Sequence, residues 1–417
     1  MRRCLKLIVA LALAHGATAM AAESMEDVKS TVEALQATIK AQQARLDQLE
    51  AKMDMDMRTE MAKVARELAA DADQHAAVPS WLDNLKFYGD LRLRYQNDFQ
   101  SGSGRARRPK LRNRARYRLR FGFIKTWLDE QLEVGFRLTS GDNAGAPTST
   151  NETMGDGFFR DDIRIDRAYA IYRPNAIKGL TIAGGKVANP LVHTDLVWDE
   201  DVNPEGFWAQ YKFKAGPAEP FANVGYFIVQ ENAGGLQQLD AILMSYQVGN
   251  TWTITDDINW QVAVTYYDYD HTKQLGWVTR GGYEMVNLTH KVRWKMFKLP
   301  WCAYFDLVHN CEDDYPGGTD DGEADDGFAI GVQVGENEKK GDWSLAYKYA
   351  RIERFCTPPL NDADFNFTNV QGHSIGAKYN LTDFLTVGAK VFVLRHIIAP
   401  IEDQNEITTQ VDIAWKF

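Results

Sequence analysis

The sequence predicts an all-β transmembrane barrel of about sixteen antiparallel strands, preceded by a long α-helical coiled coil. Three observations support this fold class. The last eleven residues, Ile407 to Phe417, alternate strictly between apolar and polar side chains, as a strand with one apolar face does. Similar alternating segments recur from residue 85 onward, and their connections are in turn short and long. Before residue 78 the apolar residues follow helical spacing instead.

Residues 1–22 have the pattern of a cleaved export signal. A basic start precedes an apolar stretch from Leu7 to Ala14, and a run of small residues follows. Without the three basic residues of this leader, the chain keeps 44 of its 47 basic residues against 57 acidic ones, a formal charge near −13. We therefore expect no nucleic-acid partner.

Residues 23–77 contain neither glycine nor proline and predict one helix. Its apolar positions follow a heptad seam that ends in a local stutter: Met25, Val28, Val32, Leu35, Ile39, Leu46, Leu49, Met53, Met57, Met61, Val64 and Leu68. We expect a periplasmic coiled coil, because a lone helix has no other means of burying so narrow a stripe. The alternative is a single amphipathic helix lying on another surface. Residues 78–84, which include Pro79, link this segment to the barrel at 85–417.

The alternating segments predict the strands of the barrel. Their ranges are 85–97, 112–127, 131–140, 162–173, 179–187, 205–214, 220–230, 238–248, 258–269, 284–297, 301–311, 327–335, 343–354, 372–380, 384–395 and 406–417. Even-numbered strands lead into short turns and odd-numbered ones into long polar loops, which is typical of an outer-membrane barrel with both termini in the periplasm. Closure of the last strand on the first would remove the exposed edges.

A basic ladder marks the second of these strands. Five arginines alternate with other residues, and a guanidinium group cannot face hydrocarbon, so the ladder must line the barrel interior. Cations of the same parity occur on the strand before it and on a later strand, and together they predict a basic, water-filled inner wall: Arg92, Arg94, Arg112, Arg114, Arg116, Arg118, Arg120, Lys291, Arg293 and Lys295. The alternative is that these cations simply pair with interior carboxylates such as Asp90 and Glu133.

An acidic segment follows the fifth strand, between Pro190 and Pro204. We expect it to fold into the lumen and to place carboxylates opposite the arginines, which would create a transverse field. The residues of this predicted constriction loop are Asp195, Trp198, Asp199, Glu200, Asp201 and Glu205. The alternative is an ordinary acidic loop on the surface.

Several ordered blocks of residues 80–417 resemble the bacterial putative porin family. They are RNRARYRLRF at 112–121, GFRLTSGD at 135–142, DRAYAIY at 166–172, GGKVANP at 184–190, WDEDVNPEG at 198–206 and the terminal WKF. The resemblance implies a diffusion channel and, by similarity to general porins, a sixteen-stranded homotrimer whose third outer loop folds inward. Arg167 would face lipid in our register, so we expect a bulge near Asp166 or a shift of register there.

The predicted function is an outer-membrane porin for passive diffusion of small hydrophilic solutes and ions. Expected partners are outer-membrane lipid and lipopolysaccharide, and the barrel-assembly machinery, whose terminal recognition signal Trp415 and Phe417 resemble. One alternative is an envelope tether that reaches peptidoglycan through the coiled coil. Another is a substrate-specific channel, which would need a line of aromatic side chains inside. Our register places only Tyr88, Trp208, Tyr267, Tyr304 and Phe392 there.

Candidates for catalysis, cofactor binding or metal binding are lacking in the sequence. The eight histidines show no zinc-ligand spacing, and no serine lies in a nucleophile elbow. After the leader, Cys302, Cys311 and Cys356 allow at most one disulfide within a protomer, and a bridge between Cys311 and Cys356 is disfavoured by the distance between alternate strands. The acidic loop 312–326 could bind divalent cations, although a solvated loop is the simpler interpretation.

Overall fold

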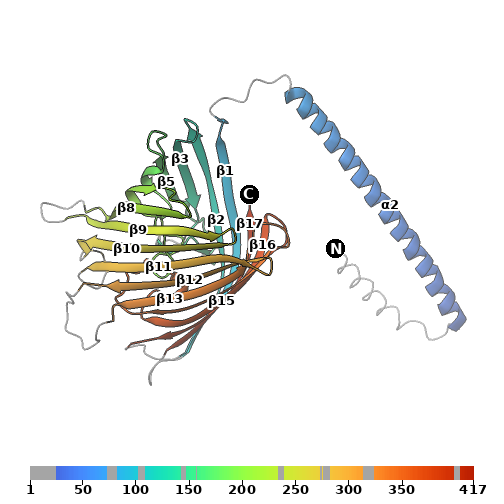
Figure 1. Cartoon of the computed structure of the whole chain (residues 1–417). Coiled ribbons are helices and arrows are strands. Elements are labelled where there is room, and N and C mark those ends of the chain that lie inside the picture. Colours follow the sequence, from blue (N-terminus) through green and yellow to red (C-terminus); the bar gives the residue numbers. More distant parts are fainter. Residues whose placement is uncertain are drawn as a thin grey trace. The chain divides into compact units, whose positions relative to one another are not determined.

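The computed structural model describes residues 25–72, 82–101, 109–141, 147–155, 157–232, 239–272, 275, 282–312, 324–398 and 404–417. The chain divides into two units, Met1–Asp83 and Asn84–Phe417, each of which is described by itself (Figure 1). The predicted leader 1–22 and residues 78–81 of the predicted linker lie outside the described residues.

The first unit contains one helix, α2 (Met25–Ala72), of 48 residues. The seam residues whose side chains are described are 47 to 68% exposed: Ile39, Leu46, Leu49, Met53, Met57, Met61 and Val64. The stripe is therefore exposed along the described part of the helix. Within the described part of the chain, no helix has the length and apolar composition needed to cross a bilayer.

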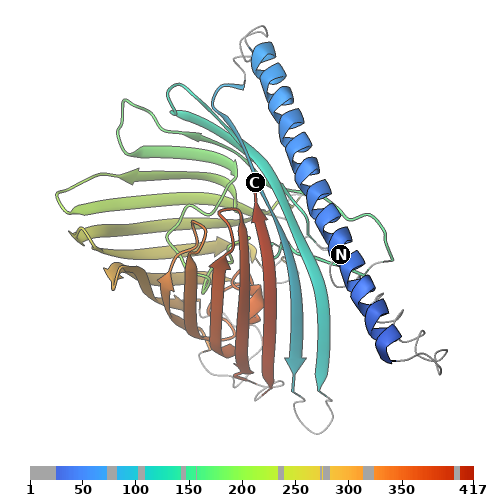
Figure 2. The ribbon, with the colours of Figure 1, turned by 90° about the vertical axis from the view of Figure 1, so that its right-hand side faces the viewer.

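The second unit is one closed antiparallel sheet (Figures 1 and 2). Its strands are β1 (Leu85–Gln100), β2 (Lys110–Trp127), β3 (Leu132–Thr139), β4 (Glu152–Thr153), β5 (Arg164–Tyr172), β6 (Leu180–Lys186), β7 (Glu205–Lys212), β8 (Ala218–Gln230), β9 (Ala241–Thr255), β10 (Ile258–Asp270), β11 (Tyr283–Met296), β12 (Leu299–Asn310), β13 (Asp326–Gly335), β14 (Trp343–Ile352), β15 (Val370–Asn380), β16 (Leu385–His396) and β17 (Asn405–Lys416). The two-residue β4 pairs with β2 inside a loop, so sixteen of the seventeen strands form the ring. The predicted barrel is confirmed.

The ring closes between the first and last strands, as expected. β1 pairs with β17 from Asp90 opposite Lys416 to Gln100 opposite Glu406. Beyond this ladder, the Gly89 N–H donates to the Phe417 carbonyl at 2.8 Å, and the Phe417 N–H donates to the Gly89 carbonyl at 3.1 Å. A Cβ added at Gly89 would lie 2.5 Å from Cε2 of Phe417, so the terminal ring packs directly over this glycine.

The strand boundaries differ most from the prediction at β9. The predicted strand ends at residue 248, whereas β9 continues to Thr255. Gly249 and Asn250 disfavour strands locally, but each is paired with β10, opposite Ala263 and Val262. Pairing with a neighbouring strand outweighs local propensity here, and the turn shrinks to residues 256–257.

The two faces of the sheet differ in chemistry. On β10, for example, Val264 on the outer face is 42% exposed, whereas Thr265 and Tyr267 on the inner face are fully buried. The inner side chains are buried because two long loops lie against them. Those loops define the candidate site.

Candidate functional site: the barrel lumen and its two inward loops

The basic ladder on β2 lies beside the basic residues of β1. Arg116 pairs in register with Arg94, and Arg118 with Arg92, so four guanidinium groups lie on adjacent positions of the inner face. On the outer face of β2, Leu119 is 40% and Phe121 is 45% exposed, as expected for side chains that face lipid. The strict alternation of this strand fixes which face the arginines occupy.

Most of these arginines have carboxylate partners. Asp90 accepts from both Arg118 and Arg120 at 2.7 Å, and Arg114 lies 2.6 Å from Asp98. Arg94 contacts Asp412 at 2.7 Å and Asp364 at 3.2 Å. The alternative that these cations pair with interior carboxylates is thus correct for Asp90. It is not correct for Glu133, which pairs with Arg173 at 3.0 Å.

Arg92 differs from its neighbours. Its Nη2 donates to the neutral amide oxygen of Asn151 at 2.6 Å, and its buried Nε has no hydrogen-bond partner among the described residues. The inner face of β1 therefore holds one cation that no carboxylate contacts directly.

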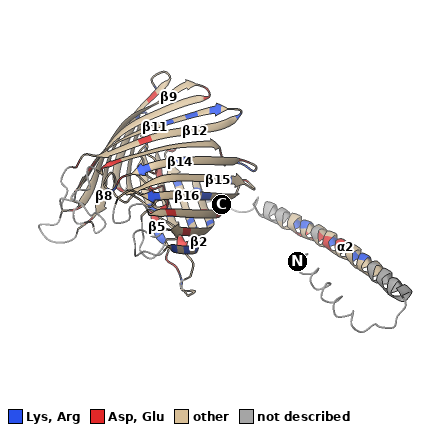
Figure 3. Cartoon of the chain, turned by 90° about the horizontal axis from the view of Figure 1, so that it is seen from below, with Lys and Arg blue, Asp and Glu red and all other residues tan. Residues whose placement is uncertain are grey.

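The ten predicted cations do not form a single wall. Lys291, Arg293 and Lys295 lie on β11, which six strands of the ring separate from β1 on one side and eight on the other. That prediction was wrong because sequence parity gives the face of a strand but not its position around the ring. Basic residues consequently lie on opposite sides of the barrel (Figure 3).

The segment between β6 and β7, residues 187–204, packs against the inner face. Leu196, Val197 and Trp198 are at most 2% exposed, and the Trp198 ring lies 6.3 Å from the ring of Tyr267 on β10. The Val192 N–H donates to Oε1 of Gln247 on β9 at 2.9 Å, and the Thr194 hydroxyl donates to Asp306 on β12. We call this segment the first inward loop.

A second inward loop, residues 353–369 between β14 and β15, was not anticipated. Its Leu360 carbonyl accepts from the Asp199 N–H at 2.8 Å, and its Asp362 N–H donates to the Asp195 carbonyl at 3.2 Å. Phe365 is fully buried against Phe392 of β16. The available signal was a group of apolar residues within a long polar loop: Phe355, Cys356, Leu360 and Phe365.

Lys348 of β14 joins the two inward loops. Its ammonium group lies 2.7 Å from Asp195 of the first loop and 2.7 Å from Asp362 of the second. The lysine side chain is only 8% exposed and also lies over the Phe365 ring, at 4.4 Å from its centroid. This lysine was not among the predicted site residues, although its even position on an alternating strand could have identified it.

The acidic residues of the predicted constriction loop have different surroundings. Asp195 is held by Lys348, and Asp201 accepts from the Thr150 N–H at 3.1 Å and lies 3.7 Å from Arg120. Asp199 accepts from the N–H groups of Asp201 and Ala363. Glu205 lies on β7 and pairs with Lys186 instead of facing the arginines. Glu200 alone among the loop's four carboxylates is exposed.

Burial and neighbouring charges shift the pKa values of two of these loop carboxyls in opposite directions. Burial, together with Asp362 and Asp201 nearby, raises the pKa of Asp199 to about 8. Burial acts in the same direction on Asp362, but the Lys348 and Lys390 ammonium groups and the hydrogen bonds from its neighbours together outweigh burial and lower the pKa of that carboxyl to about 2. At neutral pH the Asp199 carboxyl is therefore mainly protonated, so it contributes little to any field across the lumen.

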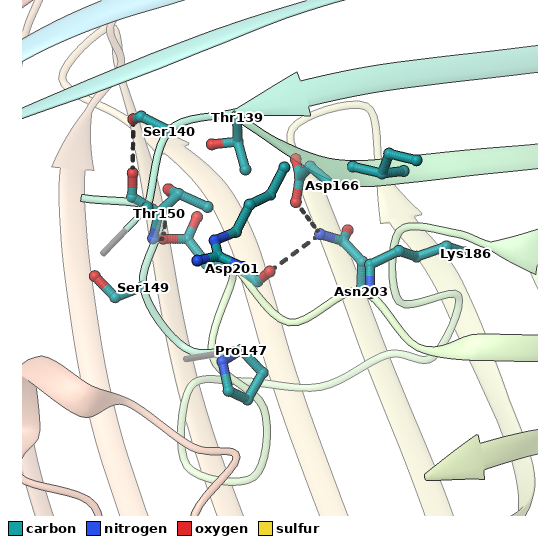
Figure 4. A pocket seen from close by; sticks show the side chains of 12 residues that line it. Thr139, Ser140, Pro147, Ser149, Thr150, Asp166, Lys186, Asp201 and Asn203 are labelled. Carbon is teal, nitrogen blue, oxygen red and sulfur yellow. Dashed lines mark hydrogen bonds between the residues drawn. The ribbon is translucent and has the colours of Figure 1, made fainter. Parts of the chain in front are cut away.

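A bulge at Asp166 resolves the position of Arg167. The register of β5 against β3 shifts between Arg137 and Leu138, which leaves Asp166 between the paired residues. The expected bulge is confirmed, and Arg167 donates through Nε to Oδ1 of Asn203 at 2.8 Å. Asn203 also donates to Asp166 at 2.7 Å, within a polar pocket that anchors the end of the first inward loop (Figure 4).

The other sequence expectations concern single side chains. Trp415 pairs in register with Leu91 and is partly exposed, and Phe417 is 62% exposed. Cys302, Cys311 and Cys356 form no disulfide with one another.

Residues 313–323 of the predicted acidic loop lie outside the described part of the chain. At its edge, His309, Asp325 and Asp326 bring ligand atoms within 4.8 Å of one another, a grouping that sequence spacing does not reveal.

Comparison with known proteins agrees with this geometry. Residues 107–276 match the family described as putative porins. OprB of Pseudomonas putida has a similar structure, with a TM-score of 0.53, 12% identity, and coverage of 81% of this chain and 96% of the other. OmpF of Salmonella typhi gives 0.49 and 11%, with 80% and 97% covered, and a mutant porin of Rh. blastica gives 0.44 and 11%, with 80% and 100% covered. No curated protein matches in sequence.

Proposed function

We propose that this chain, which matches the putative porin family over residues 107–276, forms a water-filled channel through the bacterial outer membrane. Small hydrophilic solutes and ions would cross it by passive diffusion. The observation that carries this proposal is a closed barrel with lipid-compatible side chains outside and charged side chains inside. A charged interior of this kind needs water, because the cost of burying ions in a dry core is several kcal/mol each, by order of magnitude.

Selection of solutes by their size and charge is favoured over a specific binding path for one solute. Of the five aromatic residues expected inside, Tyr267 and Phe392 are fully buried in the core that the inward loops complete. Trp208 and Tyr304 pack against the same core. These rings are therefore used to hold the loops, which argues against a substrate-specific channel lined by aromatic residues.

Planar-bilayer recording tests the proposal directly. Purified, folded protein is expected to give stepwise increases of conductance that scale with salt concentration, because ions cross through water. Heat-denatured protein in the same detergent is the control. A folded barrel that gives no steps would contradict a channel function.

For the helix, we propose a periplasmic coiled coil that joins the barrels of a homotrimer. The exposed heptad seam of α2 supports this, since three copies could bury what one chain leaves in water. The other proposed partners are lipid and lipopolysaccharide around the barrel, and the barrel-assembly machinery, which would recognise Trp415 and Phe417 at the end of β17.

A tether to peptidoglycan is the second candidate for α2. It is favoured by the same exposed surface, which also carries charged residues along the helix. The two roles predict different outcomes when the helix is removed.

A further inference from the structure

Two lysines on the inner face of the barrel lie outside the cations anticipated from the sequence. Lys378 of β15 and Lys390 of β16 share the inward parity of Ser374 and Phe392, which are buried on the same strands. In the ring these strands continue through β17 to Arg92 of β1. On this inner surface Asp412 of β17, which Arg94 binds at 2.7 Å, lies between the two lysines and β1.

Glycines bring the two lysines together. Lys390 is in register with Gly376 on β15, and Lys378 is in register with Gly388 on β16. A Cβ added at either glycine would lie 3.3 Å from Cγ of the lysine opposite. Each lysine stem therefore crosses the neighbouring strand where that strand has no side chain, which places two cations side by side on one wall.

Carboxylates do not neutralise this pair directly. Among the described residues, no carboxylate lies within ion-pair distance of Lys378, Lys390 or Arg92. The Lys390 ammonium group instead lies 4.5 Å from the ring centroid of Phe392. The charges that act on Lys378 come from Glu200, Lys390, Asp412 and Arg92, and Asp412 is already bound to Arg94.

The opposing loop supplies little negative charge. Asp195 is bound by Lys348, Asp201 lies near Arg120, and the Asp199 carboxyl is buried between backbone donors. Glu200 is thus the one exposed carboxylate of the first inward loop, and its charge acts on Lys378. Other carboxylates near these cations, namely Asp362, Asp412 and Asp201, already contact Lys348, Arg94 and Arg120. The three cations without direct carboxylate partners therefore leave a net positive field where the loop narrows the lumen.

We infer that the channel prefers small anions, such as chloride, phosphate and short carboxylates, and that Lys378, Lys390 and Arg92 determine this preference opposite Glu200. The inference rests on the proposed channel function. It assigns selectivity to the wall formed by β15, β16 and β1, whereas the paired arginines of β2 contribute less because Asp90 and Asp98 offset them.

Reversal potentials of the full-length protein in planar bilayers, measured across a tenfold gradient of KCl, test this inference. The unmodified channel is expected to be more permeable to chloride than to potassium. The double variant Lys378→Gln/Lys390→Gln is expected to lower the ratio of chloride to potassium permeability by about three- to tenfold, as estimated for two unit charges within about 10 Å of the ion path. Glu200→Gln is expected to raise the ratio.

A matched control removes two lysines elsewhere. Lys214→Gln/Lys298→Gln makes the same change of charge at exposed positions in short turns, outside the strands of the barrel, and it should leave the ratio almost unchanged. A permeability ratio that is unchanged in both Lys378→Gln/Lys390→Gln and Glu200→Gln would overturn the assignment, as would a cation preference of the unmodified channel. Glu200→Gln lies in a loop and decides the question if the lysine variant fails to fold. Absence of conducting channels would instead contradict the channel function itself.

Discussion

At the scale of single residues, the electrostatics of the barrel interior depend on which partner each charged side chain has. Arginines at alternate positions of β2 are all directed inward by the pleat, yet their surroundings differ because partners come from other strands and from the loops. Lys348 is the clearest case. Two carboxylates from different loops meet one ammonium group in a buried site.

Replacing Lys348 by methionine should destabilise the docked loops. Asp362 would remain buried without its cation, and breaking a buried pair from one side costs about 3–5 kcal/mol. We expect a clear fall in the midpoint of heat denaturation in detergent. Lys340→Met, at an exposed position in a short turn, is the control.

The triple variant Lys348→Met/Asp195→Asn/Asp362→Asn should regain part of the lost stability, since no unpaired charge remains. If Lys348→Met denatured at the same temperature as the unmodified protein, the ion-pair account of loop docking would be incorrect.

At the scale of elements, the barrel is narrowed by two loops that hold each other. The first inward loop donates to the second through the Asp199 N–H, and the second donates back through the N–H groups of Asp362 and Ala363. Because the Asp199 carboxyl lies between Asp201 and Asp362, its ionisation places three negative charges together, with Lys348 as the nearby cation.

Loop docking should therefore weaken as the pH rises. The pKa of Asp199 is raised from 3.8 to about 8 in the docked state, so the docked state binds the proton more tightly than the undocked state does. Stability is highest at acid pH and falls across the interval between these two values, with no further loss from this group above about 8. Open-channel current noise is expected to be greater at pH 9 than at pH 6.

Asp199→Asn should remove most of this pH dependence, whereas Glu200→Gln at the neighbouring exposed position should retain it. Equal noise at both pH values in the unmodified protein would show that Asp199 does not control docking.

At the scale of the whole molecule, the first and last strands of the barrel pair with each other, and the helix leaves its described apolar seam exposed. The ring is complete in one chain, because β1 and β17 pair over eleven positions from Asp90 to Gln100. The helix, by contrast, leaves its described seam residues from Ile39 to Val64 exposed.

Removing residues 25–72 should separate the two proposed roles of the helix. If it joins trimers, the shortened protein is expected to lose its oligomer on analytical ultracentrifugation in detergent while each barrel stays folded. A tether predicts an intact oligomer, unchanged conductance and a weakened envelope, measured as sensitivity to detergent. Replacing Leu46 and Leu49 with glutamine tests the seam alone, with Gln48→Ala, at an exposed position off the seam, as the control. An intact oligomer with this double variant would contradict the coiled coil.

Features that depend on local periodicity could be predicted from the sequence. Period-two alternation gave the strands and their inward faces, as on β2 and β17, and the need to close the edges placed β17 beside β1. It even located the bulge at Asp166, since Arg167 could not face lipid. These properties follow from the geometry of a single strand.

Contacts between residues far apart in the sequence became known from the folded structure alone. Periodicity does not report position around the ring, so it could not separate Lys291 from Arg92, nor bring Lys348 to Asp195 and Asp362. It also could not show that packing would engage most of the acidic loop and leave Glu200 opposite Lys378. Such contacts depend on how the closed sheet curves and on how two loops share its interior, which no single segment encodes.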